Sequence, residues 1–266
     1  MVTKIDFDNN DQVLNYVVNN GELPRYIYKY TSLESLHLIL ESSKLKFSKP
    51  SEFNDPFDCH ITIDTDNTES EIDNYIKFLE KNNDLTEEKI KILKKKFHNP
   101  KELFEITNKS VNGAIEKHGV TCFSKKEDNL IMWAHYADKH KGVCLKFDIL
   151  GDTDFFMTPF PVIYKKEYSR YNYIRNKDGL GKFLLETKSI DWEYEQEIRV
   201  MKLGAGLYDF KNNSLVEIIF GSRTLKEERE QIVKMTKENL FKITKFKHCM
   251  ISDKEFAIEI CDYLQK

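Results

Sequence analysis

The sequence predicts an α+β protein with a mixed, mostly antiparallel sheet, flanking helices and one helical insertion. Short segments rich in aromatic and aliphatic residues, bounded by turn-forming residues, recur along the chain and predict strands. Between residues 69 and 118 the pattern changes to strongly charged segments with apolar residues at helical spacing. We therefore expect residues 1–266 to form a single domain with a helical insertion at about 69–118.

The first elements have clear local signals. Residues 26–31 are aromatic-rich and predict a strand, and Ser32 is a suitable N-cap for the helix that follows, in which apolar residues recur at helical spacing. A short strand is predicted at 45–48. The next segment, 49–58, contains two prolines, two Asp and one Asn, which predict a loop of defined shape.

The insertion reads as two or three helices. Its lysine-rich run at 89–96 predicts a solvated helix face rather than a phosphate-binding one, because Glu87 and Glu88 lie in the same helix and no aromatic residues are interleaved. The remaining predicted elements are strands at 119–124, 142–148, 161–164, 215–221 and 244–251, and helices at 129–138 and 224–240.

Composition narrows the classes of function. The 41 basic and 44 acidic side chains give a pI near 6.2, so no global field draws the protein to nucleic acid or to an anionic membrane. Five scattered cysteines without a Cys-x-x-Cys pair argue against a disulfide framework and a zinc site. The N-terminus does not resemble a signal peptide, and no stretch approaches membrane-spanning length. We expect a soluble cytoplasmic protein without a membrane partner.

The most informative segment is 192–200, where polar and apolar residues alternate. An extended strand would place Glu195, Glu197 and Arg199 on one face. Same-face positions lie about 6.6 Å apart, so Arg199 could hold Glu197 ionised while Glu195 accepts a proton or a hydrogen bond. The alternative is an ordinary exposed strand face with alternating charges.

A second group of chemistry-bearing residues lies between 122 and 145. Trp133 and Tyr136 are three residues apart, which places them on one helix face with directed polar groups suited to a ligand site. The alternative is that both fill the core. His135 and His140 would diverge by about 140° on a helix, so a shared metal ion is not expected.

Several familiar motifs are missing. The sequence has no dinucleotide-binding glycine pattern, no phosphate-loop lysine motif, no Gly-x-Ser-x-Gly elbow and no His-Glu-x-x-His. A lone nucleophilic cysteine remains open, since Cys122 and Cys144 have His118 and His140 nearby in the sequence.

Four segments together resemble a bacterial family named for its domain of unknown function, DUF2971. They are YIYKYTS at 26–32, KFSKPSEFNDPFD at 46–58, the stretch from Thr121 to Asp148, and WEYEQEIR at 192–199. The resemblance spans most of the chain apart from the helical insertion. The family name implies no reaction.

The order of these segments is also similar to that of ADP-ribosyltransferases, in which a first strand holds the dinucleotide and a late Glu-x-Glu strand grips the nicotinamide ribose. This similarity implies an ADP-ribosyltransferase-like fold that takes NAD as its substrate. Lys29 departs from the pattern, because that superfamily uses Arg or His at the anchor position. The resemblance implies catalytic roles for Glu197, Glu195 and Tyr136, and NAD-binding roles for Lys29, Tyr30, Thr31, Phe123, Ser124, Trp133 and Arg199.

The leading hypothesis is an NAD-using ADP-ribosyltransferase or NAD glycohydrolase, of the kind found among toxins and phage-defence effectors, acting on a protein or nucleic acid. One alternative is a metal-dependent hydrolase or nuclease using Asp55, Asp58, Glu195 and Glu197. Another is a module that binds a ligand or partner without catalysis. Metal dependence of activity distinguishes the first two, and loss of turnover on Glu197 substitution distinguishes catalysis from binding.

Overall fold

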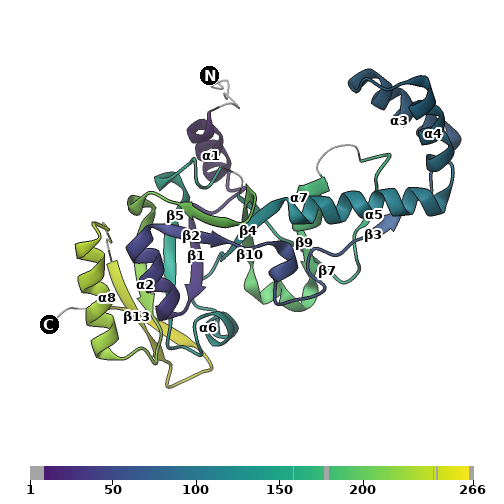
Figure 1. The fold of residues 1–266 in the computed structure, drawn as a ribbon. Coiled ribbons are helices and arrows are strands. Elements are labelled where there is room, and N and C mark those ends of the chain that lie inside the picture. Colours follow the sequence, from purple (N-terminus) through teal and green to yellow (C-terminus); the bar gives the residue numbers. More distant parts are fainter. Residues whose placement is uncertain (1–8, 158, 177–179, 242, 244, 264–266) are drawn as a thin grey trace. The chain divides into compact units, whose positions relative to one another are not determined.

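The computed structural model describes residues 9–157, 159–176, 180–241, 243 and 245–263. The chain divides into two compact units (Figure 1). The sheet unit consists of Met1–Ser48, Gly119–Val162 and Asp191–Lys266, and the helical unit consists of Lys49–His118 and Ile163–Ile190. The helical unit therefore includes a second segment, 163–190, beyond the insertion that the sequence predicts at 69–118.

An eight-stranded sheet forms the centre of the sheet unit. Its strand order is β14-β13-β12-β5-β1-β4-β10-β6. Of the described strand pairs in this sheet, β12 and β13 run parallel and the others antiparallel, which confirms the predicted α+β class with a mixed, mostly antiparallel sheet. The strands are β1 (Tyr26–Thr31), β4 (His118–Ser124), β5 (Val143–Asp148), β6 (Pro159–Pro161), β10 (Glu197–Leu203), β12 (Leu215–Phe220), β13 (Lys245–Ile251) and β14 (Ile258–Asp262).

The core of the sheet unit lies between the sheet and helices α2 and α8, which are labelled in Figure 1. Ser32 caps α2 as predicted, because its hydroxyl accepts a hydrogen bond from the Ser35 amide at 3.1 Å. Leu36 and Leu40 of α2, Ile232 of α8 and Phe147 of β5 are fully buried in this core. The helices of the unit are α1 (Asn10–Asn19), α2 (Leu33–Ser42), α6 (Leu130–Tyr136) and α8 (Lys226–Glu238).

Short elements complete the sheet unit. A two-stranded ribbon pairs β2 (Lys44–Phe47) with β11 (Gly206–Asp209) in antiparallel register. Three short 3₁₀ helices follow strands or precede them: η2 (Ile149–Gly151), η3 (Ile190–Glu195) and η4 (Asn212–Ser214). The turn η3 leads directly into β10 and so determines where the acidic segment becomes extended.

Three helices of the helical unit, α3, α4 and α5, lie within residues 69–118, where the sequence predicts two or three helices. A capping box begins α3, in which Thr68 and Glu71 exchange side-chain to backbone hydrogen bonds. Ile76, Phe97 and Leu103 bury the apolar faces of the helices against one another. Its elements are η1 (Pro50–Glu52), β3 (Thr62–Asp64), α3 (Glu69–Asn82), α4 (Glu87–Phe97), α5 (Pro100–Glu116), β7 (Ile163–Lys165), β8 (Arg170–Asn172), α7 (Leu180–Leu185) and β9 (Thr187–Ser189).

In the part of the chain that the structure describes, every helix is too short or too polar to span a bilayer.

Candidate functional site

Three neighbouring strands of the sheet unit, β1, β4 and β10, bring together many of the polar residues that the sequence singles out. Helix α6 and the turn η3 add further groups beside them. We call this set the polar cluster. It consists of Lys29, Thr121, Cys122, Ser124, Tyr136, Glu195, Glu197 and Arg199.

The strand predicted for the acidic segment is correct only from Glu197 onward. Glu195 ends the 3₁₀ turn η3, and Gln196 has a left-handed backbone with φ of 44° before β10 begins. The prediction that Glu195 shares a strand face with Glu197 and Arg199 is therefore wrong. A residue in the left-handed region breaks the two-residue periodicity, although the letters of the sequence continue to alternate.

Glu197 and Arg199 do share a face of β10, and they form a buried ion pair. The Arg199 Nε atom donates to Glu197 Oε1 at 2.8 Å, and Nη2 donates to Oε2 at 3.1 Å. Glu197 is 3% exposed and Arg199 is 0% exposed. The alternative of an exposed strand face is thus wrong for these two residues. A two-point guanidinium contact favours the ionised carboxylate, as the sequence-based hypothesis requires.

Lys29 of β1 brings a second positive charge to the cluster. Its Nζ atom donates to Thr121 Oγ1 at 2.9 Å and to the Cys122 carbonyl at 3.1 Å. Burial lowers the pKa of the Lys29 ammonium, while the neighbouring Cys122 and Glu197 act in the opposite direction. Glu197 therefore lies within electrostatic range of two cations, one on its own strand and one two strands away.

Glu195 is held by groups from α6 and β4. The Tyr136 hydroxyl donates to Glu195 Oε1 at 2.6 Å, and the Ser124 hydroxyl donates to the Glu195 backbone carbonyl at 2.7 Å. At the start of α6, Asn129 Nδ2 donates to the Tyr194 carbonyl at 2.6 Å. Both ends of α6 therefore fix the turn that carries Glu195, and the structure brings Ser124, Tyr136 and Glu195 together as the sequence suggested.

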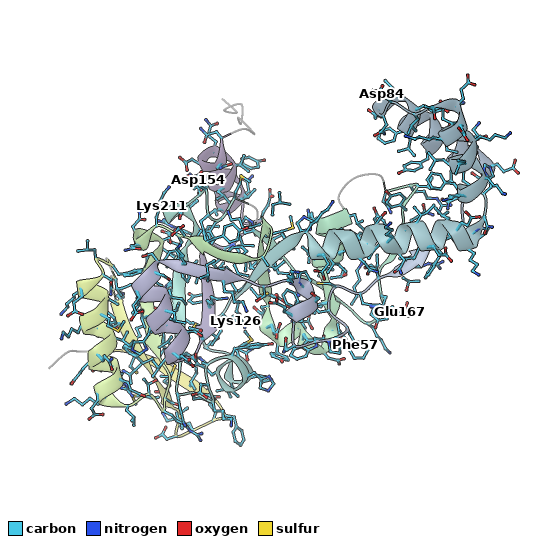
Figure 2. All side chains as sticks on the ribbon, viewed as in Figure 1. Phe57, Asp84, Lys126, Asp154, Glu167 and Lys211 are labelled. Atoms are coloured by element: carbon cyan, nitrogen blue, oxygen red, sulfur yellow. The ribbon has the colours of Figure 1, made fainter. Side chains whose placement is uncertain are left out.

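Two aromatic residues proposed for NAD binding, Tyr30 and Trp133, are buried in the core of the sheet unit. Tyr30 and Trp133 pack edge to face with ring centroids 5.2 Å apart, and Trp133 is fully buried. The Tyr30 hydroxyl donates to the carbonyl of Lys126, which Figure 2 labels, and the Trp133 indole donates to the Glu127 carbonyl. Their polar atoms are thus satisfied by the loop between β4 and α6, which favours a supporting role.

Two further residues from the NAD-binding prediction are also buried. Phe123 packs against Phe147 and Phe156, and the Lys29 ammonium lies 5.3 Å from the centre of its ring. Thr31 ends β1, where it pairs with Val143 of β5. These contacts position Lys29 and the end of the strand.

Thr121 and Cys122 also belong to the cluster; the sequence analysis did not single out Thr121, and it considered Cys122 only as a possible nucleophile. Both precede Ser124 on β4, so the strand that supplies Ser124 also presents them near Lys29. Burial raises the pKa of the Cys122 thiol well above its ordinary value, and Glu197 adds to the rise. Burial does the same at Cys144. Both effects disfavour a thiolate nucleophile, which was left open from the sequence.

The carboxylates considered for a metal site divide between the two units. In the helical unit, Asp55 accepts a hydrogen bond from the Phe57 amide, and Asp58 lies 3.7 Å from Lys188 Nζ. These contacts shape the loop that the prolines predict. Among the residues that the structure describes, no group of three or more His, Cys, Asp or Glu side chains has the arrangement of a metal site.

Replacing Tyr136 by Phe removes the hydroxyl that donates to Glu195. We expect Tyr136→Phe to lower the free energy of unfolding by about 1.5–3 kcal/mol, because the acceptor is a buried carboxylate. Tyr208→Phe is a suitable control, since the Tyr208 hydroxyl donates to neutral carbonyls and should contribute about 1 kcal/mol. Urea denaturation of both variants measures the difference, and equal losses would contradict a charged acceptor at Glu195.

Comparison with known proteins reaches one part of the chain. No curated protein and no solved structure matches the chain. The resemblance to ADP-ribosyltransferases therefore has no support from relatives. Residues 132–200, which include Tyr136, Glu195, Glu197 and Arg199 of the polar cluster, match the model of a family described as a protein of unknown function, DUF2971, as the motifs in this segment predict.

Proposed function

We propose that the polar cluster is the active site of an NAD-using ADP-ribosyltransferase or NAD glycohydrolase. The observation that supports this most is the buried Glu197 carboxylate, paired at two points with Arg199 and within electrostatic range of Lys29. A carboxylate held in a fixed orientation can stabilise the positive charge that develops when a nicotinamide glycosidic bond is cleaved.

The reaction breaks the bond between the ribose C1′ atom and the pyridinium nitrogen. The electron pair goes to the nitrogen, so nicotinamide leaves as a neutral base and positive charge develops on the ribose ring. Glu197 would stabilise that charge where it appears, because its orientation is set in advance by Arg199. A carboxylate oriented in this way would need no reorganisation at this step, which would make it more effective than a carboxylate in water.

Glu195 is suited to the second half of the reaction. A water molecule or a hydroxyl of a macromolecular acceptor attacks C1′ and must lose a proton. The Glu195 carboxylate can accept that proton, and its hydrogen bond from Tyr136 fixes its orientation. Water as the attacking group gives a glycohydrolase, and a protein or nucleic acid as the attacking group gives a transferase.

Lys29 is the candidate contact for the negatively charged part of the dinucleotide. A lysine supplies a single point charge, so we expect it to attract a phosphate without the two-point recognition that an arginine gives. Its hydrogen bonds to β4 fix the position of the ammonium.

A purely structural role for the cluster is the rival interpretation, because buried and mutually paired charges also occur in protein cores. The metal-dependent hydrolase is the other. Incubation of the purified protein with NAD, with and without EDTA, separates all three. We expect free nicotinamide to accumulate in proportion to protein concentration and independently of EDTA, as measured by liquid chromatography.

Transfer is tested with NAD labelled in the adenylate phosphate, incubated with the protein and cell extract. Label on protein or on nucleic acid identifies the class of acceptor. If neither nicotinamide nor labelled product forms, the NAD assignment fails. If activity appears only with a divalent metal and disappears with EDTA, the hydrolase interpretation replaces it.

A further inference from the structure

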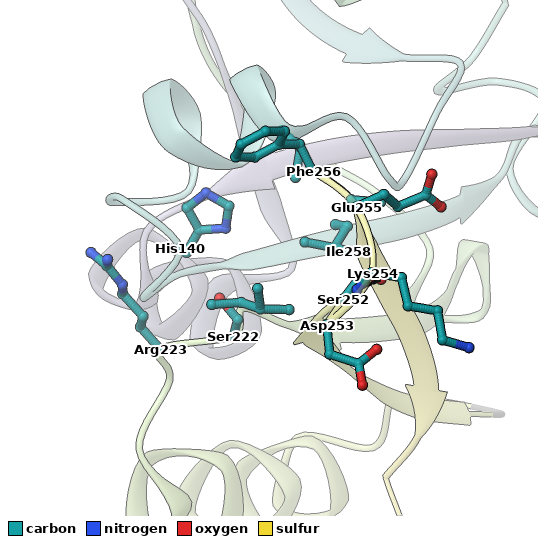
Figure 3. Close-up of a pocket in the computed structure, with 12 residues that line it drawn as sticks. His140, Ser222, Arg223, Ser252, Asp253, Lys254, Glu255, Phe256 and Ile258 are labelled. Carbon is teal, nitrogen blue, oxygen red and sulfur yellow. Dashed lines mark hydrogen bonds between the residues drawn. The ribbon is translucent and has the colours of Figure 1, made fainter.

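The sheet unit has a hollow at the far end of the β13–β14 hairpin, apart from the residues of the polar cluster (Figure 3). Its volume is about 580 Å³, within the range of small-molecule sites. The hairpin turn, Ser252–Ala257, forms one wall, and two turns that precede α8 and follow α6 form the other. The side chains that matter for its chemistry are His140, Arg223, Ile251, Phe256 and Ile258.

The apolar wall of this hollow is unusually open to solvent. Phe256 is 101% exposed and Ile251 is 71% exposed, although both line the hollow. His140, Phe256 and Ile258 all line the hollow, and Figure 3 labels each of them. An aromatic ring bound here would cover apolar surface that the chain itself leaves in water.

Arg223 gives the hollow a positive charge. In the described part of the chain its guanidinium has no ion-pair or hydrogen-bond partner, while its backbone amide donates to the His140 carbonyl at 3.0 Å. The other charged residues of the wall, Asp253, Lys254 and Glu255, direct their side chains away from His140 and Phe256 in Figure 3. Arg223 therefore supplies a cation to the lining whose side chain has no partner among the described residues.

The backbone around Arg223 and His140 is closely packed and takes unusual dihedral angles. Asp138, Lys139 and His140 are three consecutive non-glycine residues with positive φ, at 43°, 53° and 71°. A Cβ atom at Gly221 would clash with the His140 carbonyl oxygen, so the two turns pack too closely for any other residue. Strained turns held this tightly are found where the chain positions groups for a ligand.

The His140 ring is set by the same packing. It stacks on Trp133, with ring centroids 6.3 Å apart and planes inclined by 15°. Burial lowers the pKa of His140, and the charge of Arg223 lowers it further, so the imidazole is neutral at physiological pH. His140 therefore contributes a flat surface and Arg223 contributes the charge.

We propose that this hollow is a binding site for a planar aromatic ring that carries one anionic group. The ring would lie against Phe256, Ile251 and Ile258, and the carboxylate or phosphate would pair with the guanidinium of Arg223. A guanidinium matches both anions at two points. The site does not depend on the NAD activity proposed for the polar cluster.

Isothermal titration of the full-length protein tests the site with two probes from different sources, AMP and salicylate. Binding of AMP alone indicates a nucleotide, and binding of salicylate alone indicates an aromatic carboxylate. Adenosine and salicylamide keep the rings without the charge, and inorganic phosphate keeps the charge without a ring. We expect saturable binding of at least one probe and about tenfold or weaker binding of its matched controls.

Two variants assign the binding to this hollow. Phe256→Ala and Arg223→Gln should each weaken binding about tenfold. Phe57→Ala and Arg170→Gln alter exposed residues of the helical unit and should leave affinity unchanged. The exposed Phe256 ring makes no core contact, so an unchanged melting temperature shows that its loss does not act through folding.

The proposal is overturned if neither probe binds the parent protein. It is also overturned if a probe binds but both hollow variants retain the parent affinity, because the binding then occurs elsewhere on the chain.

Discussion

Glu197→Gln is expected to lower the rate of nicotinamide release by about two to three orders of magnitude. The substitution keeps the size of the side chain but removes the negative charge that would face the ribose as positive charge develops there. Removing one such positioned group typically raises the activation barrier by about 3–4 kcal/mol. The initial rate of NAD cleavage, measured at saturating NAD and corrected for folded protein, gives the effect directly.

A matched control is available in the same sheet. Glu217 of β12 is also 3% exposed and lies 3.0 Å from the ammonium of Lys247. Glu217→Gln should therefore perturb folding in a similar way and leave the NAD rate unchanged. Parent activity in Glu197→Gln, or equal losses in both variants, would remove Glu197 from the mechanism.

Elements with strong local signals were predictable from the sequence. The aromatic run of β1, the Ser32 cap of α2 and the apolar run of β12 each determine their own conformation over a few residues. The pairing of Glu197 with Arg199 was predictable for the same reason, because two residues separated by one on a strand must share a face.

Features that depend on distant contacts were not predictable. The strand β3 pairs in parallel with β8, more than a hundred residues later, which is why segment 163–190 belongs to the helical unit. The left-handed Gln196 has no signature that distinguishes it from a strand residue. Burial of the acidic segment also depends on which distant elements pack around it, and that packing could not be predicted from a single sequence.

The hollow beside Arg223 also depends on contacts between distant parts of the chain, so it was not predictable from the sequence. His140 was not expected to share a metal ion with His135, and its ring stacks on Trp133. Its position opposite Phe256 depends on the return of the chain through β13 and β14, more than a hundred residues further on. No local pattern in the sequence links the two residues.

Arg199→Met is expected to lower the free energy of unfolding by about 3–5 kcal/mol, because it leaves the buried Glu197 carboxylate without its two-point partner. Urea denaturation followed by tryptophan fluorescence measures this effect in the sheet unit, since Trp133 and Trp192 both belong to it. Arg25→Met is the control. Arg25 contacts Asp148 at 2.8 Å, but its side chain is 51% exposed, so we expect a loss of about 1 kcal/mol or less.

The double variant Glu197→Gln with Arg199→Met identifies the origin of that loss. Removing both charges leaves no ionised group unpaired at this position, so the double variant should be more stable than Arg199→Met alone. Arg199→Lys should fall between the parent and Arg199→Met, because lysine keeps the charge and loses the two-point contact. If Arg199→Met were no more destabilising than Arg25→Met, the pair would not hold Glu197 ionised, and the electrostatic basis of the proposed catalysis would be lost.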